Sequence, residues 1–484
     1  MNYIGIDLGT SAVKLLLCDG RGKILAEVSE SYPVYTPHAG WSEQNPEDWF
    51  DAVLRGLERL GGEDVAGISF GGQMHGLVAL DEHDNVIRPC ILWNDGRTER
   101  QTEWLNNVFG REKLSACTGN IAFAGFTAPK LLWLKENEPQ NFAKISKIML
   151  PKDYIAYRLT GTFCTDYSDA SGTLLLDVKN RRWSQEMCDV CGIYAEQLPR
   201  LYESYAPVGY VKSCYRGIGG IGERTVVAAG AGDNAAAAIG TGTVYDGACN
   251  ISLGTSGTLF ISNDKFLSDK NNALHSFAHA NGKYHLMGCL LSAASANKWW
   301  TEDILGANYS LAEQARDIMG KNEVLFLPYL SGERSPHNDV NARGAFIGLT
   351  HSTTRAQMSL AVLEGVAFAF RDCLNIAVRD GVSVASSTIC GGGAKSRLWC
   401  EIMADVLGIR IDAVKTEQGP SYGAAILAMV ACGEYPSVEE AVGRIIRRVP
   451  LVQPDEKISA LYNQRYAAFS SLYPALKKWF KENA

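Results

Sequence analysis

The sequence is organised around residues 226–243, which read V-V-A-A-G-A-G-D-N-A-A-A-A-I-G-T-G-T. A short β-branched run leads into small residues, then into Asp233 and Asn234, and then into an alanine-rich segment that predicts a helix. Small residues let the backbone and a ligand approach each other closely. Asp233 has two interpretations: a helix N-cap, or a general base on a tight strand-to-helix turn in a cleft between two domains. We favour the base, because capping does not explain the Gly and Ala residues before it.

Length, composition and charge narrow the class of protein. At 484 residues the chain is too long for one ordinary hydrophobic core, so we expect two or three domains. A content of 46% hydrophobic and 20% charged residues is typical of a globular protein, and no apolar run of 18 or more residues predicts a transmembrane helix. A net charge of -7 without a clustered basic face argues against nucleic-acid binding.

The N-terminus and the cysteines favour a cytoplasmic protein. Asp7 and Lys14 interrupt the first apolar stretch, which argues against a signal peptide. The 13 cysteines are odd in number and scattered, as expected in a reducing compartment. Cys188 and Cys191 form a lone C-x-x-C without a second pair at zinc-site spacing, so we interpret them as incidental thiols.

The first 31 residues predict a three-strand meander with a tight turn at residues 7–11, D-L-G-T-S. The N–H groups and hydroxyls of such a turn, that of Thr10 included, can hold phosphate oxygens, and Asp7 can hold a metal ion or its water. Lys14 on the next strand is placed to reach the same phosphate. Taken alone the motif is weak, because Gly and Thr are ordinary turn residues.

The turn occurs twice in the chain. Residues 6–11 read I-D-L-G-T-S and residues 251–256 read I-S-L-G-T-S, each between two apolar strands. A repeat at half the chain length predicts two domains of similar plan, each opening with a hairpin. We place the domains at 1–245 and 246–484. Two such turns facing each other would clamp a polyphosphate, and Gly254, Thr255 and Ser256 would form the second.

The loop after the predicted strand 65–70 is a candidate substrate site. Gln73, Met74 and His75 stand between glycines there, and ligand sites in open α/β sheets lie at such strand ends. An amide and an imidazole suit a small polar substrate. The alternative is a buried structural histidine.

A second glycine-rich strand end is a candidate nucleotide site. Gly391, Gly392, Gly393 and Ala394 follow the predicted strand 387–390 and precede a helix. This geometry lets a nucleotide lie against the backbone. The alternative is glycine used only for close helix packing. Between the two halves, residues 160–183 are rich in Thr, Ser, Asp and Gly and predict hairpins beside a polar site.

Longer patterns carry a family resemblance that covers residues 4–431. They include G-F-T-A-P-K-L-L-W-L-K-E-N at 125–137 and G-A-F-I-G-L at 344–349, which continues through Gln357 to Glu364. The chain resembles the FGGY carbohydrate kinases, and this implies an α/β fold of two ribonuclease-H-like, actin-like ATPase domains with a cleft between them. Within the family it is most similar to members that phosphorylate D-xylulose, through W-S-E-Q at 41–44, L-W-N-D-G-R at 92–97 and P-Y-L-S-G-E-R at 328–334.

The resemblance implies roles for the candidate residues. Asp233 matches the catalytic base and Asp7 the acid that organises Mg²⁺. Met74, His75 and Asn234, with Gln73 beside them, match the sugar site. The residues implied around ATP are Thr10, Lys14, Gly254, Thr255, Ser256, Gly391, Gly392, Gly393 and Ala394.

The activity implied is ATP-dependent phosphorylation of D-xylulose at its 5-hydroxyl group, and a homodimer is common in the family. The nearest alternatives are kinases of ribulose, gluconate or glycerol. An actin-like ATPase that uses ATP to switch partners has the same fold, so the fold alone does not exclude it. The loop around His75 and the pair Asp233-Asn234 favour a small polar substrate.

Overall fold

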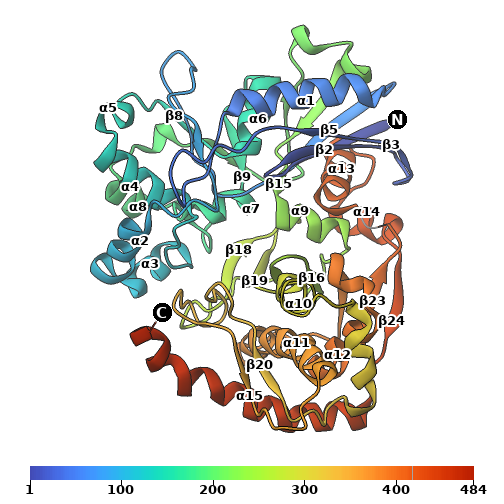
Figure 1. Ribbon diagram of the computed structural model, residues 1–484. Helices are drawn as coiled ribbons and strands as arrows, with labels where there is room; N and C mark the ends of the chain where they lie inside the picture. The colour runs from blue at the N-terminus through green and yellow to red at the C-terminus, as the bar shows by residue number, and fades with distance from the viewer. Residues whose placement is uncertain (417, 484) are drawn as a thin grey trace.

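The computed structural model describes residues 1–416 and 418–483, and their strands form two seven-stranded mixed sheets (Figure 1). The first sheet has the order β13-β14-β5-β1-β2-β3, with β15 also paired to β5. Strand β2 pairs antiparallel with both β1 and β3. Strand β5 pairs parallel with both β1 and β14. The strands are β1 (Asn2–Leu8), β2 (Ala12–Asp19), β3 (Ile24–Ser31), β5 (Val65–Gly72), β13 (Pro207–Tyr210), β14 (Ile221–Ala228) and β15 (Ala231–Gly232).

The second sheet repeats this plan in the order β18-β19-β17-β16-β22-β23-β24. Strand β16 pairs antiparallel with β17 and parallel with β22, as β1 does with β2 and β5. The predicted repeat is therefore one of topology as well as sequence, and the fold is the predicted pair of α/β domains. The strands are β16 (Cys249–Leu253), β17 (Gly257–Asn263), β18 (His275–Ala278), β19 (Tyr284–Leu290), β22 (Ser386–Cys390), β23 (Arg410–Val414) and β24 (Arg448–Val452).

Successive side chains along a strand point to opposite faces of the first sheet, and both faces are buried. On one face, Ile4, Ile6 and Leu15 pack with α1 (Pro46–Leu60) and α6 (Pro151–Thr160). Helix α1 begins as its sequence predicts, because Asn45 caps it and Pro46 occupies its first turn. On the other face, Tyr3, Leu16 and Cys18 pack with α9 (Asp233–Gly240), α13 (Gly419–Ala431) and α14 (Val438–Ile445).

Helix α13 comes late in the sequence yet packs on the first sheet, against β1, β5 and α9. Glycines permit this close approach. A Cβ atom at Gly5 would lie 1.8 Å from the carbonyl oxygen of Ser421, and one at Gly423 would lie 1.8 Å from that of Ala236. Figure 1 shows α13 beside β2 and β5, and α9 between the upper and lower bodies of the molecule.

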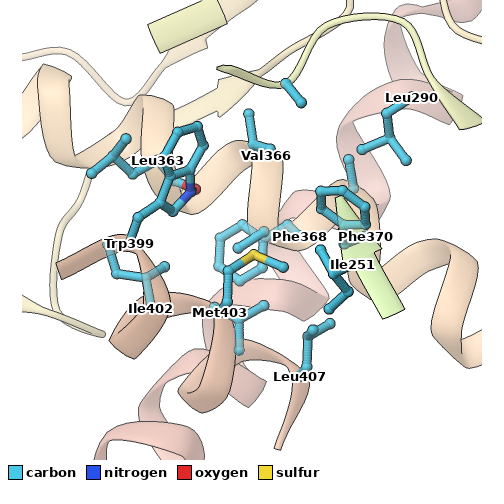
Figure 2. Close-up of a cluster of buried hydrophobic side chains, with 14 of the residues drawn as sticks. Ile251, Leu290, Leu363, Val366, Phe368, Phe370, Trp399, Ile402, Met403 and Leu407 are labelled. Atoms are coloured by element: carbon cyan, nitrogen blue, oxygen red, sulfur yellow. The ribbon is translucent and has the colours of Figure 1, made fainter. Parts of the chain in front are cut away.

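The second sheet packs against α11 (Arg355–Arg379) and α12 (Arg397–Leu407), with α15 (Glu456–Asn483) outside them. Trp399 is 1% exposed in this core, where its Nε1 atom donates to the carbonyl oxygen of Leu363 at 3.1 Å. Figure 2 shows Trp399, Met403 and Leu407 of α12 facing Val366 and Phe370 of α11. Burial of these large side chains holds the lower body together.

Short elements between β5 and β13 form a third hydrophobic cluster beside the first sheet. Residues 160–183 were predicted to form hairpins, but in this segment only β10 and β11 form a hairpin. Residues 167–173 form helical turns instead. Asp166 explains this, since its side chain caps α7 by accepting from the backbone N–H groups of Ser168 and Asp169. No helix within the described residues is both long enough and apolar enough to cross a membrane.

The remaining helices and strands are short or lie between the sheets. The helices are α2 (Glu99–Trp104), α3 (Arg111–Thr118), α4 (Thr127–Asn137), α5 (Pro139–Phe142), α7 (Tyr167–Ala170), α8 (Gln185–Cys191) and α10 (Ala294–Lys298). The strands are β4 (Glu43–Gln44), β6 (Val78–Leu80), β7 (Cys90–Ile91), β8 (Lys147–Met149), β9 (Cys164–Asp166), β10 (Leu176–Asp177), β11 (Arg182–Trp183), β12 (Arg200–Tyr202), β20 (Leu325–Leu327) and β21 (Ala345–Ile347).

Candidate active site

Asp233 is the first residue of α9, directly after β15 ends at the edge of the first sheet. Its Oδ1 atom accepts from the backbone N atom of Asn234 at 2.7 Å and from the Nδ2 atom of the same residue at 2.9 Å. The N-cap residue of α9 is Gly232, so Asp233 is not the cap. Burial raises the pKa of Asp233 to about 6, although the two hydrogen bonds oppose the rise. A carboxylate in this range is suited to accepting a proton near neutral pH.

Asp7 lies near the end of β1, in register with Lys14 on β2 and with Gly71 on β5. Burial raises the pKa of Asp7 to about 7, and the negative charge of Asp233 adds to the rise, while Lys14 opposes it. Among the described residues no hydrogen bond contributes to this balance. A carboxylate without a hydrogen-bond donor fits a cation. Mg²⁺ typically takes one or two carboxylates with phosphate and water oxygens, so Asp7 is suited to it.

Small residues line the strand ends around these two acids. Asp7 is in register with Gly71, which in turn pairs with Ala231. A Cβ atom at Gly71 would approach Pro420 to 2.9 Å and Ala236 to 3.1 Å, so only glycine leaves room for α9 and α13. A Cβ atom at Gly230, within the run before Asp233, would lie 2.8 Å from the carbonyl oxygen of Phe70, so this run serves packing as well.

Met74 and His75 follow β5, and His75 adopts a left-handed backbone with φ of 71°. Lys130, from the family pattern at 125–137, stabilises this turn by donating its Nζ atom to the carbonyl oxygen of His75 at 2.8 Å. Burial lowers the pKa of His75 to about 3, so the ring is neutral. Its Nδ1 atom lies 2.7 Å from the carbonyl oxygen of Gly172 and must donate to it, which leaves Nε2 as an acceptor.

Gln73 is 2% exposed and connects the loop after β5 to the first turn. Its Nε2 atom donates to Gln44 at 2.9 Å, and Gln44 donates to the carbonyl oxygen of Thr10 at 2.7 Å. The Thr10 hydroxyl accepts from the indole of Trp93 at 3.0 Å. Trp93 is 41% exposed, and the sequence reasoning assigned it no role. Its position just after a strand and among polar residues was the sequence feature that could have indicated a role for Trp93.

The side chain of Lys14 is engaged in two contacts within the protein. Its Nζ atom pairs with Glu27 at 3.1 Å and also donates to the side chain of Gln418, which precedes α13. Lys14 therefore connects β2 to the second half of the chain. Any approach to a phosphate requires that these contacts give way.

The second turn and the 391–394 segment come together on the second sheet. Gly391 has φ of 89°, and a Cβ atom there would lie 2.7 Å from the carbonyl of Leu253. The carbonyl oxygens of Gly254 and Thr255 accept from the backbone N–H groups of Ala294 and Ala293, at 2.8 Å and 3.0 Å. The turns thus join the start of α10. Ser256 is also tied to this region, through Leu291.

A cavity of about 970 Å³ opens beside these turns. Thr255, Gly392 and Gly393 line it, so the structure joins three of the predicted nucleotide residues in one space. It also contributes groups that the sequence reasoning missed. They include the charged groups of Lys298, Lys395 and Arg397, the amide of Asn297, and the aromatic rings of Trp299 and Tyr309.

Arg334 comes from the loop after β20 and lies near His75 and Phe123. The Oε1 atom of Glu333 fixes the loop by accepting from the backbone N atoms of Arg334 at 2.8 Å and Leu291 at 2.9 Å. The guanidinium carbon lies 5.2 Å from the ring centre of Phe123. After burial and Lys130, its charge also contributes to the lowered pKa of His75. Arg334 ends the pattern at 328–334 that carries the resemblance, but no role was predicted for it from the sequence.

Comparison with known proteins identifies relatives of the chain. The profiles of the N-terminal and C-terminal domains of the FGGY family of carbohydrate kinases match residues 2–240 and 249–432. The xylulose kinase of Escherichia coli (strain K12) is 41% identical over 487 residues, covering 98% of this chain and 99% of the relative. The structure of a "xyloylose kinase" from Brucella ovis matches with a TM-score of 0.94 and 40% identity over 99% of this chain and 100% of that one. A gluconate kinase from Lactobacillus acidophilus has a TM-score of 0.95 and 29% identity, covering 100% and 99%.

Proposed function

Because the chain belongs to the FGGY family of carbohydrate kinases, we propose that it transfers the γ-phosphoryl group of ATP to the 5-hydroxyl group of D-xylulose. The observation that carries the proposal is the pair Asp233 and Asp7. Both lie at one edge of the first sheet, both have raised pKa values from burial, and Asp233 contributes to the pKa of Asp7. The xylulose kinase of Escherichia coli supports the choice of sugar.

In the proposed reaction Asp233 acts as the general base. Its carboxylate accepts the proton of the sugar 5-hydroxyl, whose oxygen forms a bond to the γ-phosphorus as the bond from that phosphorus to the β,γ-bridging oxygen breaks. ADP is the leaving group. Asn234 holds the Asp233 carboxylate through two hydrogen bonds, so the carboxylate is oriented before the sugar arrives.

Asp7 would hold Mg²⁺ together with the phosphates, and this ion supplies charge neutralisation during phosphoryl transfer. Thr10 and Lys14 from the first turn, and Gly254, Thr255 and Ser256 from the second, would surround the phosphates. Gly391 to Ala394 would lie beside the adenosine. Residues 1–245 would thus supply the sugar site and the base, and residues 246–484 mainly the nucleotide site.

The sugar side is assigned to Met74, His75 and Asn234. A neutral His75 whose Nε2 atom accepts hydrogen bonds suits a hydroxyl group of the sugar. Gln73 supports this loop from behind through Gln44. We place the enzyme in the cytoplasm, where ATP is available.

Gluconate is the second candidate, and Arg334 favours it. A guanidinium on the sugar side is suited to a carboxylate, which gluconate has and D-xylulose lacks. The gluconate kinase from Lactobacillus acidophilus is compatible with this alternative, but a xylulose kinase from the same organism matches with the same TM-score of 0.95 and the same 29% identity.

The deciding experiment is a coupled ADP-release assay with Mg²⁺-ATP and a panel of D-xylulose, L-xylulose, D-ribulose, L-ribulose, glycerol and gluconate. We expect the highest kcat/KM with D-xylulose. A preference for gluconate would overturn the sugar assignment and leave Asp233 as the base. ADP release that no member of the panel stimulates would overturn the kinase proposal and favour an ATPase switch.

A further inference from the structure

A fully buried ionic cluster lies behind the candidate base. The Nζ atom of Lys152 is 2.6 Å from Asp153, 2.9 Å from Asp166 and 3.6 Å from Asp169, and the four residues are at most 1% exposed. The base of the Lys152 side chain packs against β5, where a Cβ atom at Gly72 would lie 2.7 Å from the Cβ atom of Lys152. The cluster thus touches the strand end that pairs with β15, just before Asp233.

Asp166 accepts several hydrogen bonds within the cluster. Its Oδ2 atom accepts from the hydroxyls of Ser168 at 2.5 Å and Ser204 at 2.6 Å, and from the backbone N atom of Ser168 at 2.8 Å. Lys152 approaches the other oxygen of the carboxylate. A charge-assisted bond of this kind fixes the direction of the Ser168 hydroxyl.

The direction of that hydroxyl determines which further hydrogen bond Ser168 can form. Because its proton points to Asp166, its oxygen is left as an acceptor, and the backbone N atom of Gly232 donates to it at 3.2 Å. Gly232 is the residue before Asp233 and the N-cap of α9, and it has no side chain of its own to hold the turn. A continuous chain of contacts therefore runs from Lys152 through Asp166 and Ser168 to the turn that carries Asp233.

Asp169 completes the cluster without a hydrogen bond to either carboxylate oxygen in the described chain. Burial raises its pKa well above the ordinary value; the charge of Lys152 opposes the rise, and the charges of Asp153, Asp166 and Asp233 add to it.

We propose that Ser168 is a positioning residue for Asp233, with the Lys152–Asp166 pair orienting its hydroxyl so that it holds the Gly232 amide. This rests on the proposed function, in which Asp233 is the base. A general base must lie within hydrogen-bond reach of the hydroxyl that it deprotonates, and a displacement of 1 Å can reduce the rate about 100-fold.

The test compares two serines of the same segment. Ser168→Ala removes the acceptor of the Gly232 amide, and we expect kcat to fall about 10- to 100-fold while KM for the sugar and for ATP changes less than about threefold. Ser171→Ala is the matched control. Ser171 is equally buried at 1% exposure, but it accepts from Ala278 on β18 instead. We expect its kcat to stay within about twofold of the unaltered protein.

Two further variants separate positioning from a general loss of structure. Ser168→Thr keeps the hydroxyl and should restore most of the kcat. Asp166→Asn removes the charged acceptor, and its effect on kcat should not add to that of Ser168→Ala, because both act through one chain of contacts. Thermal unfolding and sugar binding by calorimetry check that each variant is folded.

The opposing results are equally specific. A kcat within twofold for Ser168→Ala, an equal loss in Ser171→Ala, or additive losses in the double variant would overturn the positioning role. Asp233→Ala is measured alongside them. Loss of turnover in Asp233→Ala with an unaffected Ser168→Ala would overturn only this inference, whereas near-normal turnover in Asp233→Ala would overturn the proposed function itself.

Discussion

At the scale of single residues, burial is the main influence on the candidate site. It raises the pKa of Asp233 to about 6 and that of Asp7 to about 7, and it lowers that of His75 to about 3. The two acids are thus placed in the range where carboxylates change charge near neutral pH, while the imidazole stays neutral. These three states suit a base, a cation ligand and a hydroxyl acceptor.

The pH dependence of turnover follows from Asp233. A base must be ionised, so we expect kcat/KM for the sugar to fall about tenfold per pH unit below about pH 6, at saturating Mg²⁺-ATP. Bound Mg²⁺ would stabilise the ionised form of Asp7 and move its titration below this range. At low Mg²⁺, activity should already decline below about pH 7.

Steady-state kinetics between pH 5 and pH 8 test this expectation. Asp233→Ala serves as the control, with turnover reduced by about two to four orders of magnitude and sugar binding retained. Its residual activity should lack the limb near pH 6. A wild-type profile that is flat down to pH 5, or a limb that survives in the variant, would contradict the assignment.

At the scale of elements, the contact between α9 and α13 determines where Asp233 lies. Helix α9 is short and rich in alanine, and α13 crosses it with Gly423 facing the carbonyl oxygen of Ala236. The backbone spacing of the two helices depends on glycine on both sides, since a Cβ atom at Gly240 would also lie 2.9 Å from the carbonyl oxygen of Gly419.

Gly423→Ala tests this dependence. The new methyl group would lie 1.8 Å from the carbonyl oxygen of Ala236, so the helices must separate, and we expect a loss of about 1 to 3 kcal/mol in the free energy of unfolding together with lower turnover. Gly222→Ala on β14 is the control, because no atom lies within 4 Å of its Cβ position. It should change stability by less than about 0.5 kcal/mol. Equal unfolding midpoints in urea for the two variants would show that the crossing tolerates a methyl group.

At the scale of the whole molecule, the two bodies are connected through helix α13. This helix packs on the first sheet although it follows most of the strands of the second sheet in the sequence, and Lys14 of β2 contacts Gln418 just before α13. A movement of one body against the other must therefore pass through α9, α13 and the segments that lead to them. The proposed sugar groups lie on the first sheet, and the large cavity lies on the second.

Closure of the two bodies is the expected consequence of this arrangement. Phosphoryl transfer needs the reacting atoms about 3 to 3.5 Å apart, so we expect sugar and a non-hydrolysable ATP analogue together to reduce the radius of gyration in small-angle X-ray scattering. Each ligand alone is the control and should produce a smaller change. An unchanged radius with both ligands bound, as checked by calorimetry, would show that the resting form is already closed. A homodimer stays a prediction, which the same experiment would test through the molecular mass.

Several features could be predicted from the sequence because they depend on neighbouring residues. Alternating apolar residues and a tight turn determine the β1–β2 hairpin, and the second copy at 251–256 predicted the same plan for the second sheet. The cap at Asn45 and the small residues before Asp233 are equally local signals. The family patterns predicted the kinase family, which the comparisons confirm.

The tertiary structure alone decided which distant segments meet. The sequence did not indicate that α13 would cross α9, that Lys152 would gather three carboxylates behind Asp233, or that Lys298 and Lys395 would line one cavity. It also misled at 167–173, where the Asp166 side chain caps a helical turn instead of a hairpin. Local propensity acts over a few residues, whereas burial and pKa depend on segments brought together by packing. The sequence by itself therefore determined the repeat, the two sheets and the family, and only packing decided the charge states and support of the candidate base.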